Sequence, residues 1–255
     1  MYKIHFITFG GPDNNFHEAV QRICAQAKSF DIFESICGYT EQDLIIDTEF
    51  WNTHGNFITN NPRGYGYWIW KPYLILKKLK QLEDNELLLY LDCGCELNIR
   101  GKEKFLKMIN IAIQKLIIGT STVSNDLAWT KRNLIEFMGM VSHPKLKEKH
   151  MQAGALLMVK CDKIVKLYEE FYQIMHNYHL IDDSVSTIPN LKGFREHRHD
   201  QSVFNLLVKK YDLIDYSMDP TEWGFTYRDR YKYIKNAVNY PIWCCRNVFG
   251  KSIMS

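Results

Sequence analysis

The residues best suited to chemistry lie within residues 86–96, where an apolar run ends abruptly in a carboxylate. Four leucines surround Tyr90 and lead directly into Asp92. This pattern is typical of a strand that is buried on both faces. A charge beside a core is costly unless it is paired, and ligands of open α/β sheets lie beyond the carboxyl ends of the strands. We therefore expect Asp92 to hold a divalent metal and, through it, a diphosphate.

A second informative stretch, residues 61–79, combines an arginine, two glycines and a cluster of aromatic residues. Gly64 and Gly66 permit unusual backbone angles. Pro72 suits the first turn of a helix, which places Lys71 near the start of that helix. Arg63 and Lys71 are candidates for contact with a phosphate group. The alternative is that the aromatic residues belong to the core and Lys71 is solvated.

A third stretch, residues 195–201, places His197, His199 and Asp200 within four positions. Imidazoles and carboxylates both coordinate metals, but this segment alone has too few properly spaced ligands for zinc. Combined with Asp92 it makes a better mixed oxygen and nitrogen site for Mn²⁺ or Mg²⁺. For Asp200 the alternative is that it caps the following helix.

Three weaker features could also face a ligand. The loop that begins after Phe9, at Gly10, follows the first strand, where a nucleotide base or ribose often lies; a plain strand-to-helix turn is the alternative. Gly154, just before a later strand, allows either close approach to a ligand or tight packing. Arg246 could fold over a diphosphate as part of a closing tail, or remain a surface residue.

Composition indicates a globular protein. The chain has 255 residues, of which 46% are hydrophobic and 14% aromatic, and its net charge is only +3. The seven cysteines form no regular disulfide framework, so we expect reduced thiols and a cytoplasmic location. No run approaches the roughly 18 apolar residues of a membrane span, so membrane contact would be peripheral. The basic residues are dispersed, which argues against nucleic acid as a partner.

The order of elements predicts an α/β fold with a mostly parallel central sheet flanked by helices. Strands are expected at 2–9, 32–37, 87–91, 116–122 and 155–159, with a last short strand at 212–216. Helices are expected at 16–29, 102–115, 130–140, 162–175 and 202–210. Between 40 and 60 we expect one short helix near 41–46 followed by loop. The segment 219–255 is aromatic and is predicted to be irregular.

These motifs resemble those of glycosyltransferases of the GT-A fold. The resemblance is to the bacterial and viral group that carries GYWxWKP, present here at 66–72, followed by a YLDxGCE-type strand end, at 90–96. More distantly the chain resembles glycosyltransferase family 8, which has an Asp-x-Asp metal motif, an Asn-Ala-Gly segment and an Asp-Gln pair. The matches here are Asp92, then Gln152-Ala153-Gly154, then Asp200-Gln201.

The resemblance implies a single Rossmann-like GT-A domain over residues 1–255. It implies transfer of a sugar from a nucleotide-diphosphate sugar to a glycan, lipid-linked or other hydroxyl acceptor, with Mn²⁺ or Mg²⁺ as cofactor. Gly94 stands where the motif has its second Asp, so the metal ligands expected are Asp92, His199 and Glu96. The residues expected at the donor are Phe9, Gly10, Arg63, Lys71, Tyr90, Asp92 and Arg246. The residues expected to be catalytic, at the reacting sugar or acceptor, are Gln152, Gln201 and Asp200, and Asp200 is the candidate base if the enzyme inverts the anomeric centre.

Three other classes of function remain open from the sequence, of which a nucleic-acid binder is the weakest because the basic residues are dispersed. A metal-dependent hydrolase of phosphate esters could use the same Asp92 and His199. A non-catalytic glycan-binding module could use the aromatic residues Trp68, Trp70 and Tyr73.

Overall fold

The computed structural model describes residues 2–213, 224–227 and 237–253. The strands are β1 (Ile4–Gly10), β2 (Ser35–Thr40), β3 (Leu87–Leu91), β4 (Glu96–Leu97), β5 (Ile117–Asn125), β6 (Lys149–Val159), β7 (Phe225–Tyr227) and β8 (Ile242–Cys244). The α-helices are α1 (Asn14–Phe30), α2 (Glu41–Ile45), α3 (Thr48–Asn60), α4 (Gly64–Tyr67), α5 (Trp70–Leu79), α6 (Lys102–Lys115), α7 (Asp126–Trp129), α8 (Arg132–Phe137), α9 (Asp162–Met175), α10 (Tyr178–Ile181) and α11 (His199–Lys210). Short 3₁₀ helices are η1 (Ile99–Gly101), η2 (Pro144–Lys147) and η3 (Ala237–Asn239).

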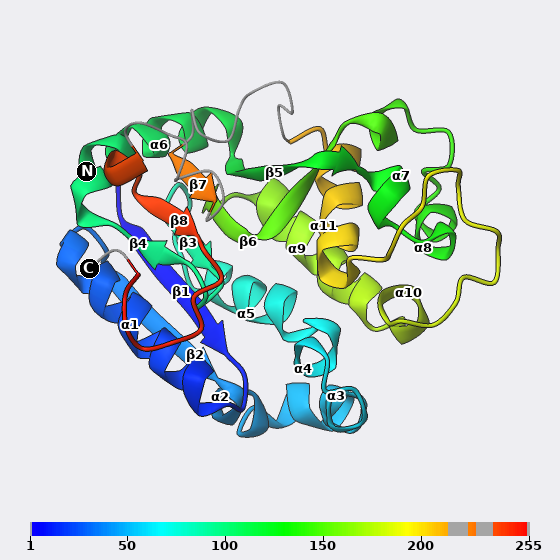
Figure 1. The fold of residues 1–255 in the computed structure, drawn as a ribbon, viewed down its shortest axis with the longest axis horizontal. Coiled ribbons are helices and arrows are strands. Elements are labelled where there is room, and N and C mark those ends of the chain that lie inside the picture. The colour runs from blue at the N-terminus through cyan, green and yellow to red at the C-terminus, as the bar shows by residue number, and fades with distance from the viewer. Residues whose placement is uncertain (1, 214–223, 228–236, 254–255) are drawn as a thin grey trace.

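The central sheet has five strands in the order β2-β1-β3-β6-β5 (Figure 1). β1 pairs in parallel with both β2 and β3, whereas β6 runs antiparallel to β3 and to β5. All strands except β6 therefore point the same way, which confirms the predicted α/β class with a mostly parallel sheet flanked by helices. A single reversed strand is common in mixed sheets of this kind.

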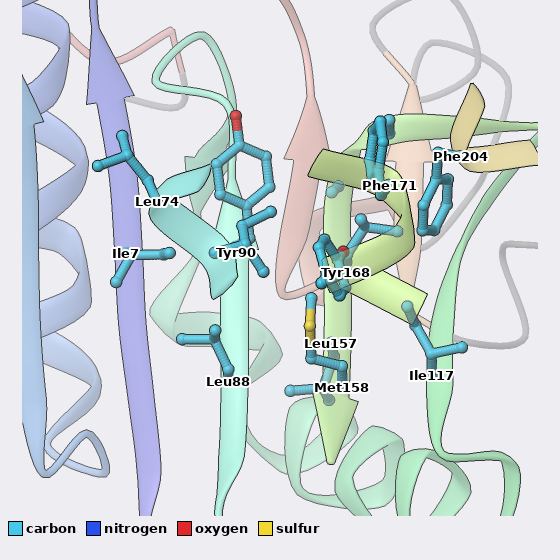
Figure 2. Packing of buried hydrophobic residues seen from close by; sticks show 14 of the residues in the cluster. Ile7, Leu74, Leu88, Tyr90, Ile117, Leu157, Met158, Tyr168, Phe171 and Phe204 are labelled. Atoms are coloured by element: carbon cyan, nitrogen blue, oxygen red, sulfur yellow. The ribbon is translucent and has the colours of Figure 1, made fainter. Parts of the chain in front are cut away.

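Strand β3 is buried along its whole length, as predicted for a strand covered on both faces. On one face, the Phe6 ring lies 5.7 Å from that of Phe33, and Phe30 of α1 lies 5.7 Å from Phe105 of α6. On the other face, Ile7 and Tyr90 of neighbouring strands lie beside Leu74 of α5, with α9 and α11 further along (Figure 2). Two layers of helices thus enclose the sheet and leave its strand ends open.

Strand β6 begins at Lys149 rather than at 155, so Gln152 and Gly154 lie within the strand and not before it. Its register against β5 shifts between Gly119 and Thr120. Irregularities of this kind bend a strand and often lie next to functional sites. At this point the backbone N–H of Asp92 donates to the Gly154 carbonyl over 2.7 Å. The β3–β6 pairing therefore continues just past the end of β3.

Two predictions about irregular segments are wrong. Residues 48–60, expected to be loop, form α3, whose N-terminus is capped by Asp47. Within 219–255, strands β7 and β8 join β4 in a small second sheet of order β4-β8-β7. The strand predicted at 212–216 lies largely outside the described residues. No helix among the described residues is long and apolar enough to cross a membrane.

The buried His54 of α3 makes the stability of the fold depend on pH. Its ring nitrogens lie 2.9 Å from the hydroxyls of Tyr178 and Tyr172. Burial, together with His176, lowers the His54 pKa from 6.5 to about 4. The unfolded chain therefore takes up this proton at higher pH than the folded chain. The contribution of neutral His54 to the stability of the fold is complete at pH values above its unfolded-state pKa. It is lost as the pH falls through its folded-state pKa.

We expect the free energy of unfolding to fall by roughly 3 kcal/mol on account of His54 as pH drops through this window. Urea unfolding at a series of pH values measures the slope. His54→Gln should flatten it without abolishing it, because the pKa values of the buried His150 and His197 are also lowered. If the free energy of unfolding changed equally steeply with pH in the natural protein and in His54→Gln, the assignment of this pH dependence to His54 would be contradicted.

Candidate active site

A cleft of about 1030 Å³ opens beyond the carboxyl ends of β1 and β3. The aromatic residues in its lining are Phe9, Phe16, Tyr65, Trp68, Trp70 and Trp129. Among the described residues, the charged side chains that line it are Asp92, Arg198 and Arg246. This is the edge of an α/β sheet at which ligands bind.

Asp92 directly follows β3 and faces the cleft, with its side chain 45% exposed. The Tyr90 hydroxyl donates to its Oδ1 over 2.6 Å. Its Oδ2 lies against Gly154, where a Cβ atom would collide with it. Gly154 therefore makes room for the Asp92 carboxylate. This is a packing role, although Gly154 also lines the cleft.

Lys71, in the first turn of α5, is buried between two carboxylates. Its Nζ lies 2.8 Å from Asp200 Oδ2 and 3.4 Å from Asp92 Oδ1, and its side chain is only 4% exposed. Burial disfavours the ammonium, but Asp200 and Asp92 together raise the Lys71 pKa above its usual value. Lys71 is therefore a charged core residue. The expectation that it contacts phosphate and the alternative that it is solvated both disagree with this position.

Asp200, at the start of α11, lies behind Lys71 rather than in the cleft. Its carboxylate is almost completely buried, and burial raises its pKa despite the opposing influence of Lys71. The structure shows no side-chain cap by Asp200 at this helix, because its partner is Lys71. Direct contact with the sugar or acceptor, as expected from the sequence, is not compatible with this burial.

The turn before α5 builds the aromatic wall. Gly64 and Gly66 have positive φ values of 59° and 80°, as expected, and Trp68 also has a φ of 61°. A Cβ at Gly66 would strike Ile58. The Trp70 indole donates to the Gly64 carbonyl over 3.0 Å, and its ring stacks on Phe9 at 3.9 Å. Phe9 therefore lies in the cleft wall.

The opposite side of the cleft carries polar groups from β6 and from the start of α11. Gln152 accepts a bond from the Thr120 hydroxyl over 3.4 Å, and Gln201 accepts one from the Ala153 N–H over 3.4 Å. Both glutamines line the cleft.

Arg198 also lines this side and stacks over Trp129 at 4.4 Å. Its neighbours His199 and Asp200 were predicted from the sequence as site residues, whereas Arg198 was not. An arginine two positions before the Asp-Gln pair was the available signal.

Arg246 is exposed at the cleft rim, on the chain that follows β8. Its backbone passes over Gly94, where a Cβ would lie 3.2 Å from the Arg246 Cα. Asn247 donates its N–H to the Gly94 carbonyl over 2.8 Å. A side chain at position 94, where the motif has its second carboxylate, would therefore press on the Arg246 backbone.

Arg22 of α1 holds the loop after Asp92 against the segment that carries Arg246. This role was not predicted from the sequence. Its guanidinium is buried and donates to the carbonyls of Asn247, Phe249, Cys93 and Cys95 over 2.6–3.0 Å. One side chain thereby joins the loop after Asp92 to the segment that carries Arg246.

Three other predicted site residues lie outside the cleft lining. Arg63 is half-exposed and pairs with Asp183 at 2.7 Å, so its charge is already compensated at the surface. Gly10 packs tightly on α1, where a Cβ would lie 2.8 Å from the Phe16 carbonyl. Tyr90 is buried and reaches the cleft only through Asp92.

Glu96 is fully buried and holds the C-terminal segment. It accepts bonds from the Asn247 amide at 2.7 Å, from the Ile253 N–H at 3.0 Å and from the Gln26 amide at 3.0 Å. Burial tends to raise its pKa, but these bonds lower it overall, so Glu96 stays ionised. The prediction that Glu96 is a metal ligand disagrees with this use of its carboxylate.

His199 is buried and donates from Nδ1 to the Ile181 carbonyl over 2.6 Å. Its ring lies against Trp68 and Tyr67, and burial lowers its pKa. The expected metal set of Asp92, Glu96 and His199 is thus not assembled. Among the described residues, no group of three or more His, Cys, Asp or Glu side chains could hold a metal ion. The donor atoms present do not fit the expected Mn²⁺ or Mg²⁺.

No protein-family model matches the chain, and no curated protein matches it in sequence. Among solved structures it is similar to mouse xyloside xylosyltransferase 1, with a TM-score of 0.44 and 9% identity over 94% of this chain and 97% of that one. It is also similar to a glycosyltransferase involved in glycosylation of the major capsid of PBCV-1, with a TM-score of 0.41 and 9% identity over 98% and 94% of the two chains. A third similar structure is the galactosyltransferase LgtC with donor and acceptor sugar analogues, with a TM-score of 0.39 and 12% identity over 93% and 86%. We base no assignment on similarities of this size.

Proposed function

We propose that the protein is a glycosyltransferase that moves a sugar from a nucleotide-diphosphate sugar to a hydroxyl group. One observation carries the proposal: a large cleft at the strand ends is lined by several aromatic rings and, among the described residues, by one carboxylate, Asp92, together with Arg198 and Arg246. Aromatic faces bind bases and sugar rings. Arginines suit phosphate oxygens. The motif resemblance of residues 66–72 and 90–96 supports the same class.

In the proposed reaction, the bond between the anomeric carbon and the diphosphate oxygen breaks, and a bond to the acceptor oxygen forms. The acceptor proton needs a base within hydrogen-bond reach. We assign this role to Asp92, because it is the one carboxylate among the described residues that lines the cleft. Tyr90 and Lys71 hold it in place. Gln152 and Gln201 present amide groups to sugar hydroxyls.

The acceptor in this proposal is a glycan or a lipid-linked sugar. All seven cysteines are free thiols. Free thiols suit a reducing compartment, so we place the enzyme in the cytoplasm.

A thermal-shift screen tests the class of function. Ligands that bind the native state raise its apparent stability. We expect a nucleoside diphosphate, such as UDP or GDP, and its sugar conjugates to raise the melting temperature. A glycan-binding module would respond to glycans alone. A phosphate-ester hydrolase would release its product without an acceptor. Either result would overturn the proposal.

Gly154→Ala should damage activity through Asp92. The added methyl group would occupy the space of Oδ2 and push the carboxylate away from its present position. We expect transfer, followed as release of nucleoside diphosphate, to fall about tenfold or more, because small displacements of reacting groups are costly. Overpacking should lower the free energy of unfolding by about 1–3 kcal/mol.

The matched control is Gly139→Ala. Its φ of 66° strains any side chain, but a Cβ there meets nothing within 4 Å. Gly139→Ala should lose some stability and keep its activity. Full activity in Gly154→Ala would show that the Asp92 position is not critical.

A further inference from the structure

We propose that this cleft binds its nucleotide donor without a divalent metal, because Lys71 takes the cation's place beside Asp92 while Arg198 and Arg246 meet the diphosphate. The inference rests on the proposed function and departs from the metal dependence that the motif resemblance implies.

The first support is the occupancy of Asp92. Its Oδ1 accepts from Tyr90 and faces the Lys71 ammonium at 3.4 Å, while its Oδ2 is pressed against Gly154. A cation bound to this carboxylate would lie close to the buried ammonium and would be repelled by it. Lys71 cannot turn away, because its side chain is enclosed and also pairs with Asp200 at 2.8 Å.

The second support is the absence of a further acidic ligand among the described residues of the cleft lining. Position 94, where the motif has its second carboxylate, is a glycine, and the C-terminal segment crowds it, because a Cβ there would lie 3.2 Å from the Arg246 Cα. Glu96 is committed to Asn247 and Ile253. Hard divalent cations need several oxygen ligands, and diphosphate oxygens would have to supply nearly all of them.

The third support is Arg246, whose positive charge lies beside position 94, where the motif has its second carboxylate. Arg246 lines the cleft directly beside Gly94, and no carboxylate among the described residues pairs with it. Arg22 fixes the backbone that follows Arg246 through the Asn247 and Phe249 carbonyls, and the loop beside it through the Cys95 carbonyl. A guanidinium carried by this backbone can stabilise the negative charge that grows on a departing diphosphate.

Arg198 supplies the second cation from the other wall. Stacking on Trp129 at 4.4 Å holds its guanidinium. Glu196 forms an exposed ion pair with it. Such a surface pair is weak and can be exchanged for a phosphate group.

Calorimetric titration of the full-length protein with UDP and with GDP tests the inference. Each titration is run once with EDTA and once with Mn²⁺. We expect the dissociation constants with and without metal to agree within about threefold. Arg246→Ala and Arg198→Ala should each weaken binding about tenfold or more in both buffers. Lys251→Ala and Arg195→Ala, which remove exposed cations outside the cleft lining, should not weaken it.

The outcomes separate the two proposals. Binding that requires Mn²⁺, or that is tightened more than about tenfold by it, would overturn metal independence and leave the glycosyltransferase assignment standing. Unchanged binding in both arginine variants would overturn their assignment to the diphosphate. If UDP, GDP and every other nucleoside diphosphate failed to bind in both buffers, the proposed function would be overturned, and the inference with it.

Discussion

Asp92→Asn should reduce sugar transfer by about 100-fold or more while leaving the fold intact. The carboxamide has nearly the same shape, and it can still accept a bond from the Tyr90 hydroxyl. It cannot take up the acceptor proton. The Asp92 side chain is only half-buried and Lys71 keeps its shorter pair with Asp200, so the substitution should cost little stability. Release of nucleoside diphosphate in the presence of acceptor measures the loss.

The nucleotide affinity of Asp92→Asn should remain close to that of the natural protein, because the arginines, and not Asp92, are proposed to hold the diphosphate. Asp84→Asn is the matched control. Asp84 is an exposed carboxylate that pairs with Lys160 away from the cleft. Near-normal transfer by a folded Asp92→Asn protein would refute the role of Asp92 as base.

Lys71→Met should lower the free energy of unfolding by about 3–5 kcal/mol. Methionine fills similar space, but it leaves the buried Asp200 without its counter-charge. An unpaired buried carboxylate either pays its desolvation cost or takes up a proton. Urea unfolding followed by fluorescence measures the change.

Two further variants test whether the lost stability comes from the buried ion pair of Lys71 and Asp200. In the double variant Lys71→Met, Asp200→Asn, the stranded charge is gone, so part of the stability should return. Lys80→Met removes a lysine from the other end of α5 whose pair with Glu169 is exposed on both sides. That change should cost at most about 1 kcal/mol. Equal losses for Lys71→Met and Lys80→Met would contradict the buried ion pair.

Local patterns in the sequence were sufficient to predict the central framework. The apolar run before Asp92 predicted β3 and its open end, because burial on both faces needs only consecutive apolar residues. Gly64 and Gly66 predicted the unusual turn, because only glycine adopts such angles without strain. Gln152 and Gln201 were singled out through the order of short motifs, and both line the cleft. The aromatic content also indicated a surface for rings.

The charged residues were harder to place, because their roles depend on partners far away in the chain. Lys71 became a core cation because α5 and α11 begin at the same place beside Asp92. Glu96 is buried because the C-terminal segment packs over it and the Ile253 N–H donates to its carboxylate. Arg63 forms an ion pair with Asp183, which lies 120 positions later in the chain, and does not line the cleft.

By itself, then, the sequence determined the α/β class, the strand that ends at Asp92 and the glycine turn that starts the aromatic wall. Each of these depends on neighbouring residues and on backbone sterics. Only the tertiary structure decided the direction of β6, the burial of Lys71 between two carboxylates and the closure of Arg246 over Gly94. Those outcomes are set by which helix and strand ends meet, and charge pairing across such contacts leaves no periodic signature in the chain.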